Sequence, residues 1–143
     1  ARGCVTILNP APYQPLSKEL LELADWIIPN ETEFKELHGQ SPTSDDILKG
    51  FRPGKNSIVT LGSEGAVLIT SGGNLTRVSA PKVNAVDTTG AGDAFVGVFA
   101  FGLASGKSPE DAMKLGIKVA SMSVTRKGAQ SSYPSQAEIE TLS

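Results

Sequence analysis

The residues best suited to chemistry in this sequence form one short turn, Gly90-Ala91-Gly92, which Asp93 follows directly. Glycines allow a tight backbone turn, and a helix that begins at such a turn leaves several N–H groups without a partner. Those N–H groups and the positive end of the helix dipole make a natural site for an anion. A carboxylate beside a bound phosphate could accept the proton of an attacking hydroxyl, so the pattern is suited to phosphoryl transfer.

The same turn also has a purely structural explanation. An acidic residue in the first turn of a helix complements the helix dipole, which is worth about 0.3–1 kcal/mol. A Gly-x-Gly-Asp sequence at a helix start is therefore not specific by itself. Local physics leaves both interpretations of Asp93 open.

Hydrophobic periodicity and cap residues predict the elements that must position this turn. An apolar, β-branched run at residues 4–8 predicts a buried strand, which the segment NPAP at residues 9–12 ends. Ser135 and Glu138 have the spacing of a capping box. The predicted helices are 17–24, 31–38, 45–49, 91–104, 108–125 and 135–142. The predicted strands are 4–8, 25–28, 57–61, 66–70 and 75–79.

The order of these elements defines the fold class. Strands that alternate with helices pair in parallel, whereas the close succession of strands at 57–61 and 66–70 requires a hairpin. We therefore expect an α/β fold with a mixed, mostly parallel sheet and flanking helices. The length of 143 residues, without a repeat or a linker, indicates one domain over residues 1–143.

Composition excludes several classes of partner. A net charge of −2 gives no basic surface for nucleic acid, and the apolar runs are too short to cross a membrane. The single cysteine, Cys4, rules out an internal disulfide and is typical of a cytoplasmic protein. The chain begins Ala1-Arg2-Gly3 without an initiator Met, which indicates a processed, truncated or incompletely recorded chain.

Three further segments contain cap and turn patterns, each of which has a simple local structural explanation. Asn30 and Glu33 have the spacing of a helix N-cap and its partner three residues on. Residues 60–65 (TLGSEG) read as a hairpin turn between two strands. Residues 124–134 (VTRKGAQSSYP) read as a helix end with two cations, then a glycine and later a proline.

Residues 84–95 (NAVDTTGAGDAF) resemble the C-terminal signature of the ribokinase-like (PfkB) carbohydrate kinases nearly letter for letter. Residues 30–33, 60–65 and 124–134 resemble other motifs of the same family, in family order. The resemblance implies a ribokinase-like fold and the transfer of a phosphoryl group from ATP to a sugar hydroxyl, D-ribose being the expected sugar. It implies that Asp93 is the catalytic base, next to the substrate, and that Gly90, Ala91 and Gly92 form the anion hole.

The resemblance also implies cofactor sites. Asn30 and Glu33 would organise Mg²⁺, its waters and the ATP phosphates, and Gly92 would contact ATP. The nucleotide-binding segment would consist of Thr60, Leu61, Gly62, Ser63, Glu64 and Gly65. A K⁺-type monovalent cation would be held by oxygens of Asp87, Thr89, Ser123, Arg126, Gly128 and Ser132.

Two departures from the family pattern matter. The family generally places an Asn near the adenine in the helix predicted at 108–125, whereas Gly116-Ile117-Lys118 stands there and no Asn follows Asn84. The family's N-terminal half, which carries most sugar contacts, is absent from these residues, so the chain resembles only the C-terminal, nucleotide-binding portion. The resemblance is compatible with a homodimer where that half is present.

Two alternatives stay open. The chain could belong to a fructokinase or another sugar kinase of the family. It could instead be a truncated, non-catalytic protein that binds nucleotide or another partner.

Because an incomplete site loses the orientation that supplies much of an enzyme's rate, we expect negligible sugar phosphorylation by residues 1–143 alone. A coupled ADP-release assay with ribose and MgATP measures this. Normal turnover of ribose by the isolated chain would contradict the expectation.

Overall fold

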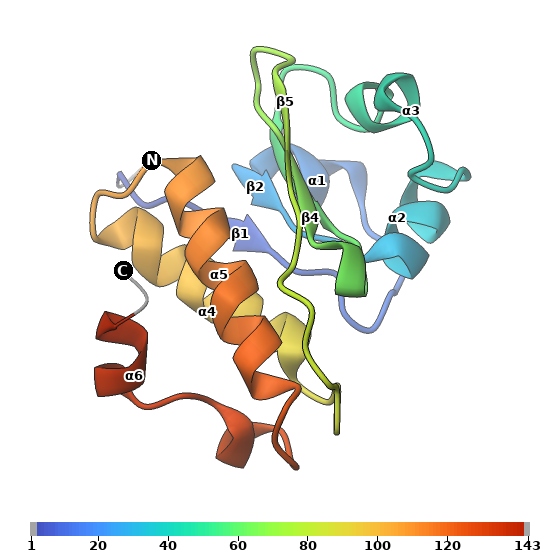
Figure 1. The fold of residues 1–143 in the computed structure, drawn as a ribbon. Helices are drawn as coiled ribbons and strands as arrows, with labels where there is room; N and C mark the ends of the chain where they lie inside the picture. Colours follow the sequence, from blue (N-terminus) through green and yellow to red (C-terminus); the bar gives the residue numbers. More distant parts are fainter. Residues whose placement is uncertain (1–2, 142–143) are drawn as a thin grey trace. The chain divides into compact units, whose positions relative to one another are not determined.

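Five strands form one sheet within residues 3–141, the part of the chain that the computed structural model describes. The strands follow chain order across the sheet (Figure 1): β1 (Ile7–Leu8), β2 (Trp26–Ile27), β3 (Asn56–Thr60), β4 (Ala66–Ile69) and β5 (Leu75–Val78). β1 pairs in parallel with β2, and β2 pairs in parallel with β3, with Ile27 opposite Ser57. The connections from β3 to β4 and from β4 to β5 are shorter than the roughly dozen residues that a parallel crossover needs. The sheet is therefore mixed, as expected.

The chain divides into two units. The sheet unit comprises the described residues up to Leu61 together with Val67–Arg77. The helical unit comprises Gly62–Ala66 together with the described residues from Val78 onward.

Side-chain caps define the helices of the sheet unit. These helices are α1 (Lys18–Leu23), α2 (Glu31–His38) and α3 (Asp45–Gly50). Ser17, Asn30 and Ser44 each accept a hydrogen bond from a backbone N–H of the first turn. The predicted bounds of α2 are confirmed, and those of α1 and α3 are right to within one residue at each end.

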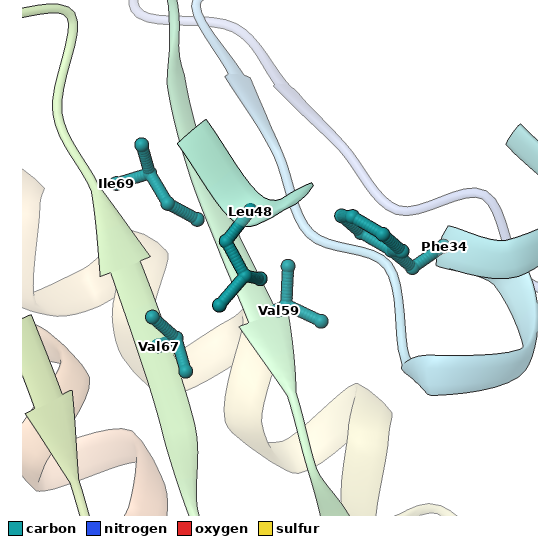
Figure 2. Close-up of a cluster of buried hydrophobic side chains, with 5 residues drawn as sticks. All are labelled: Phe34, Leu48, Val59, Val67 and Ile69. Atoms are coloured by element: carbon teal, nitrogen blue, oxygen red, sulfur yellow. The ribbon is translucent and has the colours of Figure 1, made fainter. Parts of the chain in front are cut away.

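One apolar cluster joins α2 and α3 to the sheet (Figure 2). Val67 and Ile69 lie two residues apart on β4 and therefore point to the same face of the sheet. Val59 of β3 lies beside them, and Phe34 of α2 and Leu48 of α3 cover them, all buried. This burial fixes the start of α2, where Asn30 lies, against β3.

The predicted buried strand at residues 4–8 is wrong in its extent. Only Ile7–Leu8 form β1, both half-buried, while residues 4–6 are exposed. Thr6 already contributes its carbonyl to the Trp26 N–H, and its hydroxyl donates to the Asp25 carboxylate. β1 is the outermost strand of the described sheet, so no strand within residues 3–141 pairs with its outer edge.

Two long helices, α4 (Ala91–Ala104) and α5 (Pro109–Ser123), lie side by side in the helical unit (Figure 1). Their close approach requires glycine, because a Cβ on Gly102 would lie 2.7 Å from the Ala112 Cβ. A Cβ on Gly116 would likewise lie 3.0 Å from the Phe95 ring. These two glycines therefore lie in the packing surface between the helices.

The chain after α5 forms a loop, a 3-10 turn at Gln130–Ser132 and a short helix, α6 (Gln136–Glu140). Helix α5 ends two residues before its predicted end, because the Thr125 and Arg126 N–H groups bond to carbonyls only three residues back. The predicted end of the last helix, Leu142, lies outside the described residues. Within residues 3–141, no helix combines the length and the apolar character needed to span a membrane.

Candidate active site

Helix α4 begins at the Gly90–Gly92 turn without a side-chain cap. The other α-helices among the described residues all begin with a Ser or Asn side chain that caps an N–H. The Ala91 N–H donates to the Thr88 carbonyl at 3.3 Å, a hydrogen bond at the long end of the usual range. Gly92 is exposed, and a Cβ there would meet nothing within 4 Å. The N-terminus of α4 is thus an open cluster of donors at the positive end of a helix, the arrangement that binds anions.

Gly90 is required at the base of this turn for two reasons. Its φ of 79° and ψ of 0° lie in the left-handed region, which side chains other than glycine rarely adopt. A Cβ at this position would also lie 3.0 Å from the Tyr133 hydroxyl and 3.2 Å from Ala129. The turn is therefore packed directly against the segment that follows α5.

The Asp87 carboxylate joins the turn to that same segment. One oxygen accepts the Thr89 N–H at 3.0 Å, and the other accepts the Gly128 N–H at 2.9 Å. These bonds, the one from Gly128 first, lower the pKa of Asp87 from its ordinary 3.8 to about 2. Asp87 is consequently an anchor that stays ionised, with oxygen lone pairs to spare for a cation.

The segment after α5 is held at both ends. The Val124 carbonyl accepts the N–H groups of Val86 and Asp87, at 2.7 and 3.1 Å. The Arg126 guanidinium pairs with Glu138 of α6 at 2.6 Å, which lowers the pKa of Glu138 to about 2. Residues 124–133 are therefore fixed between the turn before α4 and the start of α6.

The structure brings some of the predicted cation ligands together directly. Asp87 bonds to the backbone of Thr89 and Gly128, as described above. Ser123 is buried at the end of α5, where its carbonyl accepts the Arg126 N–H. Ser132 is buried in the 3-10 turn, with its hydroxyl donating to the Ala129 carbonyl at 2.6 Å. These residues supply hard oxygen donors, the ligand type suited to an alkali cation, and their role as a cation site remains a prediction.

Asp93 lies in the first turn of α4 and is exposed to solvent. Burial raises the pKa of the Tyr133 hydroxyl, and the negative charge of Asp93 raises it further. Asp93 thus lies on the first turn of α4, near enough to the Tyr133 hydroxyl to influence its pKa.

The predicted site residues of the sheet unit lie where β2 and β3 end. Asn30 accepts the Glu33 N–H and Glu33 accepts the Asn30 N–H, each at 2.9 Å, so the predicted capping box is confirmed. Thr60 donates its N–H to the Pro29 carbonyl and is bridged in parallel to Asn30. The carboxyl ends of parallel strands are the usual ligand-binding edge of an α/β sheet. Glu33 is buried but retains acceptor capacity beyond its one bond.

The predicted hairpin turn at residues 60–65 takes the form of a 3-10 turn over Gly62–Glu64. The Gly65 N–H donates to the Gly62 carbonyl at 3.2 Å, and Gly65 has a φ of 104°. A Cβ on Gly65 would collide with the Val78 carbonyl, so glycine is needed where β4 leaves the turn. Ser63 and Glu64 are exposed.

Sequence reasoning missed two functional contacts. The Tyr133 hydroxyl donates to the Gly90 carbonyl at 3.1 Å, and Tyr133 lies within the segment 124–134 that the motif had marked. Glu138 forms the predicted capping box with Ser135, but its ion pair with Arg126 gives no signal in the sequence, because the two residues lie twelve positions apart.

A model of the pfkB family of carbohydrate kinases matches residues 1–136. A ribokinase of Schizosaccharomyces pombe is 37% identical over 147 aligned positions, covering 96% of this chain and 46% of the relative. An Arabidopsis thaliana ribokinase solved with ribose and ATP has a TM-score of 0.89 at 34% identity, covering 98% of this chain and 47% of that one. A Vibrio cholerae fructokinase variant solved with fructose, ADP and a potassium ion has a TM-score of 0.72 at 31% identity, covering 86% and 42%.

The chain belongs to the pfkB carbohydrate kinase family, and its fold is ribokinase-like. It spans about half the length of the relatives that it matches.

The low pKa of Asp87 makes a prediction about stability. A carboxylate whose pKa is depressed on folding stabilises the folded state above its unfolded pKa, and that contribution disappears as the pH falls through the folded value. We expect Asp87→Asn to unfold at a lower urea concentration than the wild type at pH 7. The difference should shrink between pH 4 and about 2.

Urea titrations at several pH values measure this, with Glu36→Gln, an exposed change on α2, as the control. A deficit of Asp87→Asn that stays constant down to pH 2 would contradict the anchoring role of the ionised carboxylate.

Proposed function

We propose that this chain is the C-terminal, nucleotide-binding and catalytic portion of an ATP-dependent sugar kinase that phosphorylates D-ribose to D-ribose 5-phosphate. The single observation that carries the proposal is the uncapped start of α4, where open N–H groups adjoin the Asp93 carboxylate. Membership of the carbohydrate kinase family supports the same reaction class.

In this proposal the Gly90–Gly92 turn is the anion hole. Charge develops on the transferring phosphoryl group, and fixed N–H donors stabilise it without reorganising. Gly92 leaves room for a close approach because nothing surrounds its Cα on the side where a Cβ would stand. Asp93 accepts the proton of the sugar hydroxyl as that oxygen attacks phosphorus, so it is the general base.

The cofactors of this proposal are MgATP and a potassium ion. Asn30 and Glu33 would hold Mg²⁺ with its waters and the phosphates, since both present oxygen donors at the end of β2. Thr60 and the segment through Gly65 would contact the nucleotide. Asp87 and Thr89, with oxygens of Ser123, Arg126, Gly128 and Ser132, would seat K⁺, which would stiffen the turn without touching the sugar.

Ribose is proposed over other sugars because ribokinases are prominent among the relatives and solved structures that match the chain. A fructokinase is the second candidate, favoured by the match to the Vibrio cholerae structure. The single cysteine is compatible with a cytoplasmic enzyme.

The proposal predicts that Asp93→Asn lowers kcat by about 10²–10⁴-fold, the usual contribution of a general base, while MgATP binding is retained. The matched control is Asp111→Asn, because Asp111 is likewise the third residue of its helix, α5, and complements the dipole in the same way. That control should keep its kcat.

ADP release can be measured in a chimera in which residues 1–143 replace the matching segment of the Schizosaccharomyces pombe ribokinase. Equal losses of kcat in Asp93→Asn and Asp111→Asn would assign Asp93 a purely structural role and contradict the proposal.

A further inference from the structure

Tyr133 contacts the base of the anion-binding turn through its hydroxyl. The hydroxyl donates to the Gly90 carbonyl at 3.1 Å, and the ring is half-buried beside the turn. The absence of a side chain on Gly90 makes room for this contact, since a Cβ there would lie 3.0 Å from the hydroxyl oxygen. The contact is therefore built by two positions 43 residues apart, a left-handed glycine and a tyrosine.

This contact fixes more than one atom. The peptide group between Gly90 and Ala91 is planar and trans, so its C=O and its N–H point in opposite directions. A donor that holds the Gly90 carbonyl consequently also sets the direction of the Ala91 N–H. That N–H lies at the start of α4 and donates to the Thr88 carbonyl over 3.3 Å, a long bond that a charged phosphate oxygen would replace.

The Gly90 carbonyl accepts a second hydrogen bond, from the Ala94 N–H at 2.9 Å, which is the first bond of the α4 ladder. Both lone pairs of this carbonyl are thus engaged. Hydrogen bonds in a chain polarise one another, so a peptide whose carbonyl accepts two bonds has a stronger N–H donor. Tyr133 therefore affects both the direction and the strength of the Ala91 N–H.

We propose that Tyr133 is a positioning residue of the anion hole, which aims the Ala91 N–H at the terminal phosphate of the bound nucleotide. The inference rests on the proposed function, because it assigns that terminal phosphate to the turn. It adds a residue outside the signature segment, and it makes the loop after α5 part of the phosphate site.

The test compares MgATP with MgADP, because only ATP carries the phosphate that the Ala91 N–H would meet. Isothermal titration of the chain with each nucleotide gives the two dissociation constants and their ratio. Tyr133→Phe removes the hydroxyl and keeps the ring, so the segment after α5 should still pack. We expect MgATP binding to weaken about threefold to tenfold, the size of one neutral hydrogen bond, while MgADP binding is unchanged.

Tyr13→Phe is the matched control, because Tyr13 is the other tyrosine of the chain, is also half-buried, and lies in the sheet unit. It should leave the ATP-to-ADP ratio as in the wild type. Urea unfolding of Tyr133→Phe accompanies the titration, since a merely structural role would lower stability and weaken both nucleotides alike.

Three outcomes would overturn the inference, and the third of them would also refute the proposed function. Equal weakening of MgATP and MgADP, or no change in either, would refute the positioning role of Tyr133 and leave the proposed function standing. A wild-type chain that binds MgATP no more tightly than MgADP would refute the contact between turn and terminal phosphate, and with it the proposed function.

Discussion

The Asp87 carboxylate is the interaction on which the geometry of the helical unit depends. It accepts an N–H from Thr89, within its own turn, and another from Gly128, which follows α5. A neutral side chain would make these bonds more weakly, because hydrogen bonds to an ionised acceptor are roughly twice as strong. Together with the bonds of the Val124 carbonyl and the Tyr133 hydroxyl, this carboxylate ties the start of α4 to the loop after α5, and the Gly90–Gly92 turn is held by those bonds.

Packing of α4 against α5 also holds the start of α4 in place. Gly102 and Gly116 let α4 and α5 approach more closely than larger residues would, so the axis of α4 is fixed against α5. The open N–H groups at the start of α4 then have a defined direction. An anion hole needs this property, because donors that are already oriented cost no reorganisation when charge develops. In the sheet unit, the buried cluster around Phe34 fixes the start of α2 in the same manner.

Sequence patterns predicted the elements well where local rules decide them. The bounds of α2 and α4 are as predicted, since Asn30 caps α2 and the left-handed Gly90 precedes the first residue of α4. The strand at residues 4–8 was predicted too long, because burial of an apolar run depends on which strands flank it. The Gly90–Gly92 turn and the acid after it could also be identified from the sequence, because Gly-Ala-Gly before an acid is a local pattern.

Contacts between distant positions could not be predicted in this way. The bond from Tyr133 to Gly90 and the ion pair of Arg126 with Glu138 depend on how the chain after α5 returns to the turn. The bond from Gly128 to Asp87 is of the same kind, although the family resemblance had already associated these two residues. Periodicity and cap rules concern residues close together along the chain, whereas these bonds join residues that only the tertiary structure brings together.

The central claim is that the start of α4 binds a nucleotide phosphate. Gly92→Asp tests it most directly, with Gly97→Asp as the matched control, because both glycines are exposed on α4 and neither would bring a Cβ within 4 Å of a neighbour. Both variants add the same charge to the same helix, but only the first places it at the turn. MgATP titration should show binding lost in Gly92→Asp and retained in Gly97→Asp. Wild-type affinity in both variants would contradict the account.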